Sequence, residues 1–148
     1  MYEKILVPID GSETSKRGLK EAIRLAKEQG ARLRCLYVVD EHILASASFA
    51  FPYVPNLIEN LRESGKTILD EASRQAGESG VPVESSLRES GGRRISEAIL
   101  DEARKWAASL IVMGTHGRRG LSHLALGSDA ELVVRESPVP VLLVRAAS

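Results

Sequence analysis

The sequence predicts an α/β protein built on a doubly wound parallel sheet. Short apolar runs with strand character alternate with longer segments whose apolar residues recur at helical spacing, in the order βαβαβαβαβ. Alternation of this kind is typical of a parallel sheet whose connecting helices cover both faces. The 148 residues suffice for one ordinary domain with a full core, so we expect a single domain over residues 1–148.

The chain opens with a strand and a capped helix. Residues 4–9 are a nearly continuous apolar run, as expected of a strand buried on both faces. Pro8 near the end of this run suggests that strand pairing finishes there. Ser12 or Thr14 is a suitable N-cap for the helix that follows, and Gly30 is a suitable C-terminal stop.

A second strand and a long helix follow, with a long connection between them. Residues 33–39 have strand character, and residues 40–55 form a connection long enough to be a functional flap. Apolar residues at helical spacing over residues 57–76 predict a helix that Gly80 closes. Gly65-Lys66-Thr67 resembles the end of a Walker loop, but it lies inside this helical pattern. We therefore interpret Gly65 as a residue for close packing.

The second half of the chain continues the alternation. Residues 81–87 predict a weaker, more polar strand at or near a sheet edge. Apolar positions over residues 95–103 predict the next helix, and residues 110–113 form a fourth apolar strand. A last helix is expected over residues 128–136 and a final strand over residues 141–144.

The fourth strand runs into a glycine motif with the spacing Gly114-x2-Gly117-x9-Gly127-Ser128. Glycines at the end of a strand let backbone N–H groups approach a ligand closely, because no Cβ blocks the way. Ser128 is placed to cap the last helix, where unpaired amides and the positive end of the helix dipole attract anions. Together these features predict a phosphate-binding cradle.

Two further residues suggest how the cradle is completed. In doubly wound sheets, ligands bind beyond the carboxyl ends of the strands, where the chain order switches direction. Asp10 follows the first strand and would face the same crevice as Gly114 if the first and fourth strands are neighbours. Asp10 is either an acceptor for sugar hydroxyls or only a turn cap, and His116 is either a phosphate donor or a solvated loop residue.

The composition argues against several classes of protein. Lys plus Arg and Asp plus Glu each number 20, so the formal net charge is zero and we expect no nucleic-acid partner. No apolar run is long enough to cross a bilayer, so we expect no membrane association. The first residues lead straight into a strand, so we expect no secretory signal. Cys35 is the single cysteine and fits a core position. We therefore expect a soluble, cytoplasmic protein.

These segments together resemble the universal stress protein family, and the resemblance covers the whole chain. The family's opening strand, second strand and closing strand are matched by Ile5-Leu6-Val7-Pro8-Ile9-Asp10-Gly11-Ser12, Leu36-Tyr37-Val38-Val39 and Pro138-Val139-Pro140-Val141-Leu142-Leu143-Val144. The glycine motif matches the ATP-binding signature of the family's nucleotide-binding branch. The resemblance implies a three-layer, doubly wound, five-stranded parallel sheet of order 3-2-1-4-5, of the adenine nucleotide alpha hydrolase-like type. It also implies ATP bound between the first and fourth strands, and a homodimer paired through Val141–Val144.

The resemblance further implies roles for individual residues. Asp10 would contact the adenosine portion of the nucleotide, and Val38 would meet the adenine through its backbone. Met113 and Gly114 would line the ribose. The phosphates would be held by His116, Gly117, Gly127 and Ser128. The full set of implied nucleotide-binding residues is Pro8, Ile9, Asp10, Val38, Met113, Gly114, His116, Gly117, Gly127, Ser128, Asp129 and Ala130.

The chain departs from the family pattern in two places. Asp129 stands where the family usually has an apolar or neutral residue. Its carboxylate would repel phosphate unless Mg²⁺ or Mn²⁺ intervenes, so Asp129 is a candidate metal ligand. Glu89 and Gly91 replace a common Gly and Pro after the third strand, in a loop near the expected site.

Two functions fit these features. The leading one is an ATP-binding switch or sensor in the stress response, in which ATP (or ADP or AMP as isolated) alters a dimer surface or the 40–55 connection for an unidentified protein partner. The alternative is a slow ATPase or autophosphorylating phosphotransferase, which needs a positioned base and strong charge neutralisation. No base is evident beyond His116 and a metal-bound Asp129, and no arginine is held in place, so we expect little hydrolysis. The glycine motif disfavours an electron-transfer flavoprotein.

Overall fold

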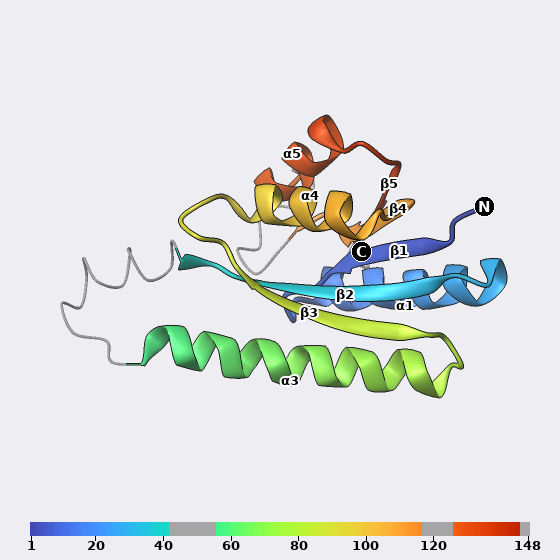
Figure 1. Cartoon of the computed structure of the whole chain (residues 1–148), viewed down its shortest axis with the longest axis horizontal. Coiled ribbons are helices and arrows are strands. Elements are labelled where there is room, and N and C mark those ends of the chain that lie inside the picture. The colour runs from blue at the N-terminus through green and yellow to red at the C-terminus, as the bar shows by residue number, and fades with distance from the viewer. Residues whose placement is uncertain (42–55, 117–125, 146–148) are drawn as a thin grey trace.

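The sheet has five parallel strands in the order β3-β2-β1-β4-β5 (Figure 1). The strands are β1 (Lys4–Pro8), β2 (Arg32–Val39), β3 (Val83–Glu89), β4 (Leu110–Gly114) and β5 (Val141–Val144). The structure, a computed structural model, describes residues 1–41, 56–116 and 126–145. The predicted doubly wound class is confirmed, and so is the strand order that the family resemblance implied. β1 and β4 are neighbours, with Ile5 opposite Leu110.

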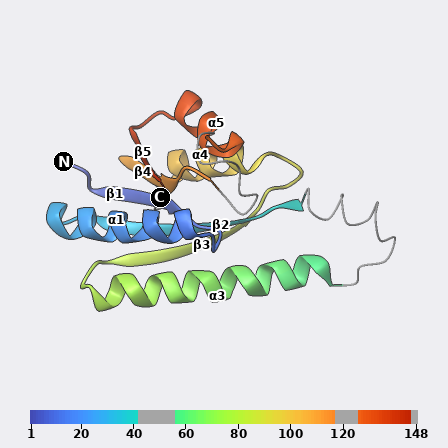
Figure 2. The same cartoon turned by 180° about the vertical axis from the view of Figure 1, so that it is seen from behind.

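Among the described residues, two helices cover each face of the sheet (Figures 1 and 2). α1 (Glu13–Gln29) and α3 (Leu57–Glu78) pack on one face, and α4 (Ile95–Trp106) and α5 (Ser128–Glu136) pack on the other. Side chains alternate along a strand, so Val7 of β1 joins the core under α1 and α3, whereas Leu6 joins the core under α4 and α5. Both faces of β1 are therefore buried, as its continuous apolar run predicted.

The ends of α1 follow the predicted capping signals. The Ser12 hydroxyl oxygen accepts a hydrogen bond from the N–H of Ser15 at 3.3 Å, so Ser12 rather than Thr14 is the N-cap. Gly30 ends the helix in the left-handed conformation, with φ of 66°. These two caps fix where the chain leaves β1 and where it enters β2.

The start of β3 differs from the prediction. The strand begins at Val83 rather than Val81, because Val81 belongs to the turn that closes α3. Its N–H donates to the carbonyl oxygen of Ala76 at 3.1 Å, and Pro82 has no N–H to offer a neighbouring strand. β3 lies at an edge of the sheet, as its polar composition predicted.

Gly65 is the close-packing residue that the sequence predicted. A Cβ at this position would lie 2.6 Å from Cδ1 of Tyr37 and 2.8 Å from Cδ1 of Leu87, which is too close for any side chain. Gly65 therefore lets α3 pack tightly against β2 and β3. Lys66 pairs with Glu63 on the exposed side of the same helix, so this segment is not a nucleotide-binding loop.

Ion pairs join α4 to β2 and β3. Glu102 of α4 is buried and pairs with Arg34 of β2 at 2.8 Å and with Arg88 of β3 at 3.3 Å. Arg88 also pairs with Asp101 at 2.7 Å. The guanidinium of Arg34 lies 4.8 Å from the centre of the Trp106 ring, which is buried in the core under α4 and α5. These contacts hold α4 at a fixed place over the sheet.

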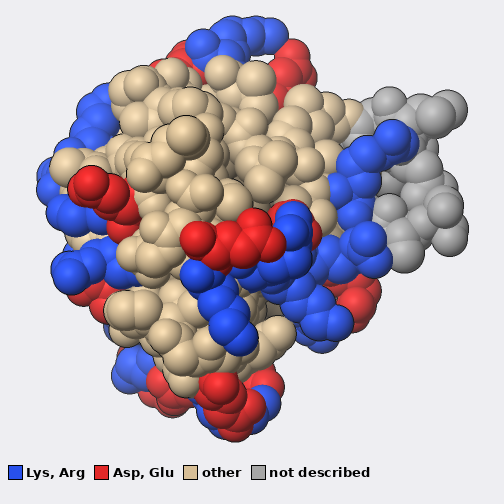
Figure 3. Space-filling view, turned by 90° about the vertical axis from the view of Figure 1, so that its right-hand side faces the viewer, with Lys and Arg blue, Asp and Glu red and all other residues tan. Residues whose placement is uncertain are grey.

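The distribution of surface charge and the position of Cys35 agree with what the composition predicted. On the face shown in Figure 3, acidic and basic side chains are interspersed rather than gathered into one broad field. None of the described helices is long and apolar enough to cross a membrane. Cys35 lies in the core with no exposed surface, and burial raises the pKa of its thiol to about 12.

Candidate functional site

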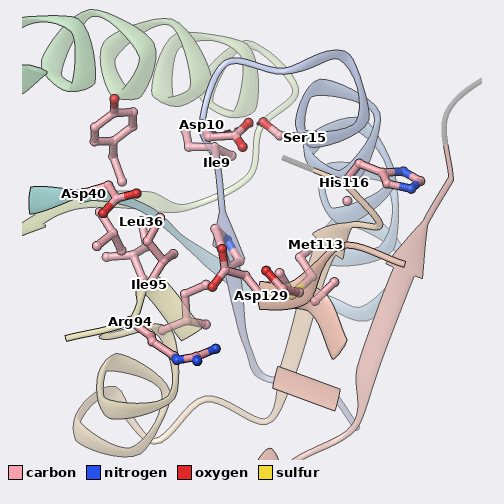
Figure 4. Close-up of a pocket in the computed structure, with 18 of the residues that line it drawn as sticks. Ile9, Asp10, Ser15, Leu36, Asp40, Arg94, Ile95, Met113, His116 and Asp129 are labelled. Atoms are coloured by element: carbon pink, nitrogen blue, oxygen red, sulfur yellow. Dashed lines mark hydrogen bonds between the residues drawn. The ribbon is translucent and has the colours of Figure 1, made fainter. Parts of the chain in front are cut away.

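A cavity of about 620 Å³ opens at the carboxyl ends of β1, β2 and β4. This is the edge at which doubly wound sheets bind ligands, and the volume is within the range of small-molecule sites. The cavity is bordered by the first turns of α4 and α5 (Figure 4). Every predicted site residue in the described ranges lines it: Pro8, Ile9, Asp10, Val38, Met113, Gly114, His116, Gly127, Ser128, Asp129 and Ala130. Gly117 lies outside the described residues.

Asp10 makes hydrogen bonds within the turn after β1 and also lines the cavity. Its carboxylate accepts a hydrogen bond from the N–H of Ser12 at 2.9 Å. Its own N–H donates to the hydroxyl of Ser15 at 3.2 Å (Figure 4). The turn interpretation of Asp10 is therefore confirmed. Because a carboxylate has two acceptor oxygens, this role does not prevent Asp10 from also meeting a ligand.

The first turn of α1 holds the loop after β4. A Cβ on Gly114 would lie 2.7 Å from the hydroxyl oxygen of Thr14, so only a glycine allows the two segments to approach this closely. The Thr14 hydroxyl donates to the backbone carbonyl of His116. The imidazole Nδ1 of His116 lies 3.0 Å from the hydroxyl oxygen of Thr115. The half-buried imidazole is therefore held at the rim of the cavity.

The start of α5 corrects one prediction. Gly127, not Ser128, is the N-cap, and Ser128 is the first helical residue, with an exposed side chain. Gly127 has extended backbone angles, and its carbonyl oxygen accepts from the N–H of Glu131 at 2.9 Å, so the helix spans Ser128–Glu136 as expected and only its N-cap differs. The first turn of α5 still lines the cavity, and the N–H groups of a first helical turn have no intrahelical partners.

Two charged residues of the cavity wall, Asp40 and Arg94, were missed by the sequence analysis. Asp40 directly follows β2 as Asp10 follows β1, so the pattern that identified Asp10 would also have found it. Arg94 precedes α4 in a loop that carries no recognisable motif. Arg94 lines the cavity, but within the described residues its guanidinium makes no hydrogen bond or ion pair, so it does not contradict the expectation that no arginine is held in place. The remaining cavity wall is formed by Ser15, Leu36, Tyr37, Leu61, Ile95, Ile99 and Thr115.

Ser90 positions the loop that carries Arg94. It is only 4% exposed, and its N–H donates to the carbonyl oxygen of Val39 at 3.0 Å. Its hydroxyl accepts from the N–H of Glu41 at 3.2 Å, and its carbonyl accepts from the N–H of Arg93 at 3.1 Å. These bonds tie the β3–α4 loop to the end of β2. The loop also contains Gly91, one of the two departures from the family pattern, with φ of 65°.

Comparisons with known proteins agree with this architecture. The profile of the Universal stress protein family matches residues 1–145. The universal stress protein YxiE of Bacillus subtilis is 39% identical over 151 residues, a match that covers 98% of this chain and all of the relative. The solved structure of the protein MJ0577 is similar with a TM-score of 0.83 at 28% identity, covering 100% of this chain and 99% of that one.

Two further solved structures with the same fold contain nucleotides. A universal stress protein in complex with cAMP is similar with a TM-score of 0.70 at 24% identity, covering 99% of this chain and 98% of that one. The universal stress protein from Archaeoglobus fulgidus in complex with dAMP has a TM-score of 0.71 at 22% identity, covering 97% and 98% of the two chains. At these identities the likeness concerns the fold.

Proposed function

This chain belongs to the universal stress protein family, and from that premise we propose that it binds an adenine nucleotide, ATP first of all, in the cavity between β1 and β4. One observation supports this most directly: the predicted site residues, which come from four separate segments of the sequence, meet around a single cavity of about 620 Å³. The adenine monophosphates bound by two relatives of the same fold also support an adenine nucleotide.

We propose one orientation for the nucleotide in this cavity. The backbone of Val38 at the end of β2 would meet the adenine, and Asp10 would accept from the adenosine portion. Met113 and Gly114 would line the ribose. The phosphates would lie at the start of α5, near Gly127, Ser128 and His116, where the helix dipole and unpaired amides favour an anion. Gly127 keeps this approach open because it has no side chain.

Asp129 is the proposed residue for a divalent metal. Within the described ranges no three His, Cys, Asp or Glu side chains gather into a metal cluster. Mg²⁺ commonly binds through one or two carboxylates together with substrate phosphates, and Asp129 lines the cavity in the first turn of α5. Mg²⁺ or Mn²⁺ would supply neutralisation of phosphate charge. We propose that Asp129 holds such an ion only when a nucleotide is present.

We propose a switch or sensor as the biological role, with a homodimer as the assembly. β5 lies at an edge of the sheet, and such an edge invites pairing with a second copy. Leu142 on β5 is 37% exposed and Val134 on α5 is 46% exposed, so β5 and the neighbouring helix both expose apolar side chains. A nucleotide at the start of α5 would then lie on the helix that borders the dimer edge, which gives a route from the site to the assembly.

The direct test is to identify the nucleotide released when the purified protein is denatured, and to titrate the emptied protein with ATP, ADP, AMP and adenosine by calorimetry. We expect adenine nucleotides to be released and to bind again. A protein that releases no nucleotide and binds none of these compounds would contradict the proposal. Single-turnover assays with labelled ATP and Mg²⁺ test the alternative: turnover near the ~1–100 s⁻¹ typical of kinases would place the protein among enzymes.

A further inference from the structure

Arg94 occupies an unusual position for an arginine. It is the N-cap of α4, and its side chain makes no capping hydrogen bond. N-caps are normally Ser, Thr, Asp or Asn, because an acceptor there satisfies a free helix amide. A cation at this end of a helix is also disfavoured by the helix dipole. Arg94 therefore makes the start of α4 less stable than a common capping residue would.

The side chain of Arg94 is also unpaired within the part of the chain that the structure describes. Its guanidinium forms no hydrogen bond or ion pair there, although it lines the cavity that also contains Asp40 and Asp129 (Figure 4). Its neighbour Arg93 differs in this respect, because it pairs with Glu97 at 2.9 Å on the outer side of α4 and does not line the cavity. Two adjacent arginines thus have different surroundings.

The surroundings of Arg94 favour an anion as its partner. α4 and α5 pack side by side on one face of the sheet (Figure 1). Residues at the start of both helices line the cavity. An anion between these helix ends would be stabilised by two helix dipoles and by the guanidinium together. A neutral base stacked on Arg94 would add no negative charge between the two positive helix ends. The planar fork of donors in arginine matches the oxygens of a phosphate group.

We propose that Arg94 is a specificity-determining residue that binds the phosphate of the nucleotide. It would do so from the α4 side of the cavity, opposite the part of the phosphate-binding cradle that lies at the start of α5. This inference rests on the proposed function, since it assigns Arg94 to a ligand of that same cavity. The Ser90 bonds to β2 hold the loop so that Arg94 faces the cavity before any ligand arrives. Arg94 therefore makes the site select phosphorylated nucleosides over adenosine.

The test compares Arg94→Ser with Arg93→Ser by calorimetric titration with adenosine, AMP and ATP. A charge-assisted contact to phosphate predicts that Arg94→Ser weakens AMP and ATP binding by about tenfold or more and leaves adenosine binding unchanged. Arg93→Ser is the matched control and should change none of the three. Arg94→Lys, which keeps the charge but not the fork, should give an intermediate loss. Because serine is a good N-cap, Arg94→Ser should also raise the melting temperature of the emptied protein by about 2–4 °C.

The possible outcomes separate this inference from the proposed function. If the wild-type protein binds AMP and ATP while Arg94→Ser binds them equally well, only the role of Arg94 is overturned. An equal loss for adenosine would assign Arg94 to the base and would also overturn it. A wild-type protein that binds none of the three compounds would overturn the proposed function and this inference together.

Discussion

The N–H of Gly127 donates a 2.8 Å hydrogen bond to the carbonyl oxygen of Thr115, and a Cβ on Gly127 would lie 3.0 Å from that same oxygen. The loop after β4 and the start of α5 are thus in backbone contact at a glycine. From the sequence, a glycine at 127 is expected to let a ligand approach the backbone. The structure adds that the chain's own backbone also requires a small residue here.

Substitution of Gly127 should therefore act on binding in proportion to side-chain size. We expect Gly127→Ala to weaken ATP binding moderately, because its Cβ needs a shift of only a few tenths of an ångström. Gly127→Val should displace the start of α5 and weaken binding by more than about tenfold. Calorimetric titration measures the affinity, and circular dichroism checks that each variant is folded. Unchanged ATP affinity in a folded Gly127→Val protein would contradict the site assignment.

Asp129 and Ser128 should respond differently to metal removal. If Asp129 holds Mg²⁺ against the phosphates, Asp129→Asn weakens ATP binding with Mg²⁺ and strengthens it in EDTA, where the repulsion between carboxylate and phosphate is relieved. Ser128→Ala removes only one hydroxyl, so its loss should be about 0.5–1.5 kcal/mol in both conditions. Titrations with and without Mg²⁺ measure both effects. The same response of Asp129→Asn in the two buffers would exclude the metal role.

Within the proposed dimer strand Val141–Val144, Leu142 is the residue to test. Leu143 packs against the core under α4 and α5, whereas Leu142 is exposed on β5. We expect Leu142→Asp to give monomers in sedimentation experiments, because a charge would be buried in the paired edge. Ser85→Asp on the opposite edge strand, β3, serves as the control and should leave the assembly unchanged. Wild-type protein that sediments as a monomer at micromolar concentration would refute the dimer.

Two glycines of α3 should respond with opposite signs. Gly65→Ala places a methyl group against Tyr37 and Leu87, so it should destabilise the protein by about 1–3 kcal/mol. Gly77 lies in the same helix with nothing within 4 Å of the added Cβ, so Gly77→Ala should stabilise by about 0.5–1 kcal/mol. Urea unfolding measures both changes. Equal effects of the two substitutions would mean that α3 does not pack as described.

The ion pairs of α4 predict a dependence of stability on acid. Hydrogen bonds from Arg88 and Lys105 hold the pKa of Asp101 at about 2, below its ordinary value. A lowered carboxyl pKa stabilises the folded state above the unfolded pKa of about 3.9, and this stabilisation disappears as the pH falls through about 2. Asp101→Asn should therefore lower the urea midpoint at pH 7 and lose that difference near pH 2. A difference that persists at pH 2 would point to packing instead.

The sequence predicted the fold well wherever a signal is local. β1 is a continuous apolar run, α1 has its cap residues at both ends, and Gly65 falls where helix and sheet approach closely. The strand order came from family resemblance, because parallel strands are paired through long crossovers and leave no local mark on the sequence. The start of β3 was placed two residues too early because Val81 belongs to a turn, and the N-cap of α5 was assigned to Ser128 although Gly127 occupies that position.

The site was predicted less completely than the fold. The glycine motif and Asp10 were found because each lies at the carboxyl end of an apolar strand. Arg94 was missed because its place depends on Ser90, which joins the β3–α4 loop to the end of β2 by bonds between distant parts of the chain. No periodicity or spacing encodes such a contact.

The burial of Cys35 has a practical consequence. A thiol reacts with alkylating reagents as its thiolate, and this one is both enclosed by the sheet and held protonated at neutral pH. As the single cysteine, it can be labelled only when the central strands separate, so the labelling rate of the natural protein reports how often the sheet opens. A compound that binds only the folded chain stabilises it, so the labelling rate of Cys35 falls as the occupancy of the binding site rises. The measurement needs neither a labelled ligand nor an introduced cysteine.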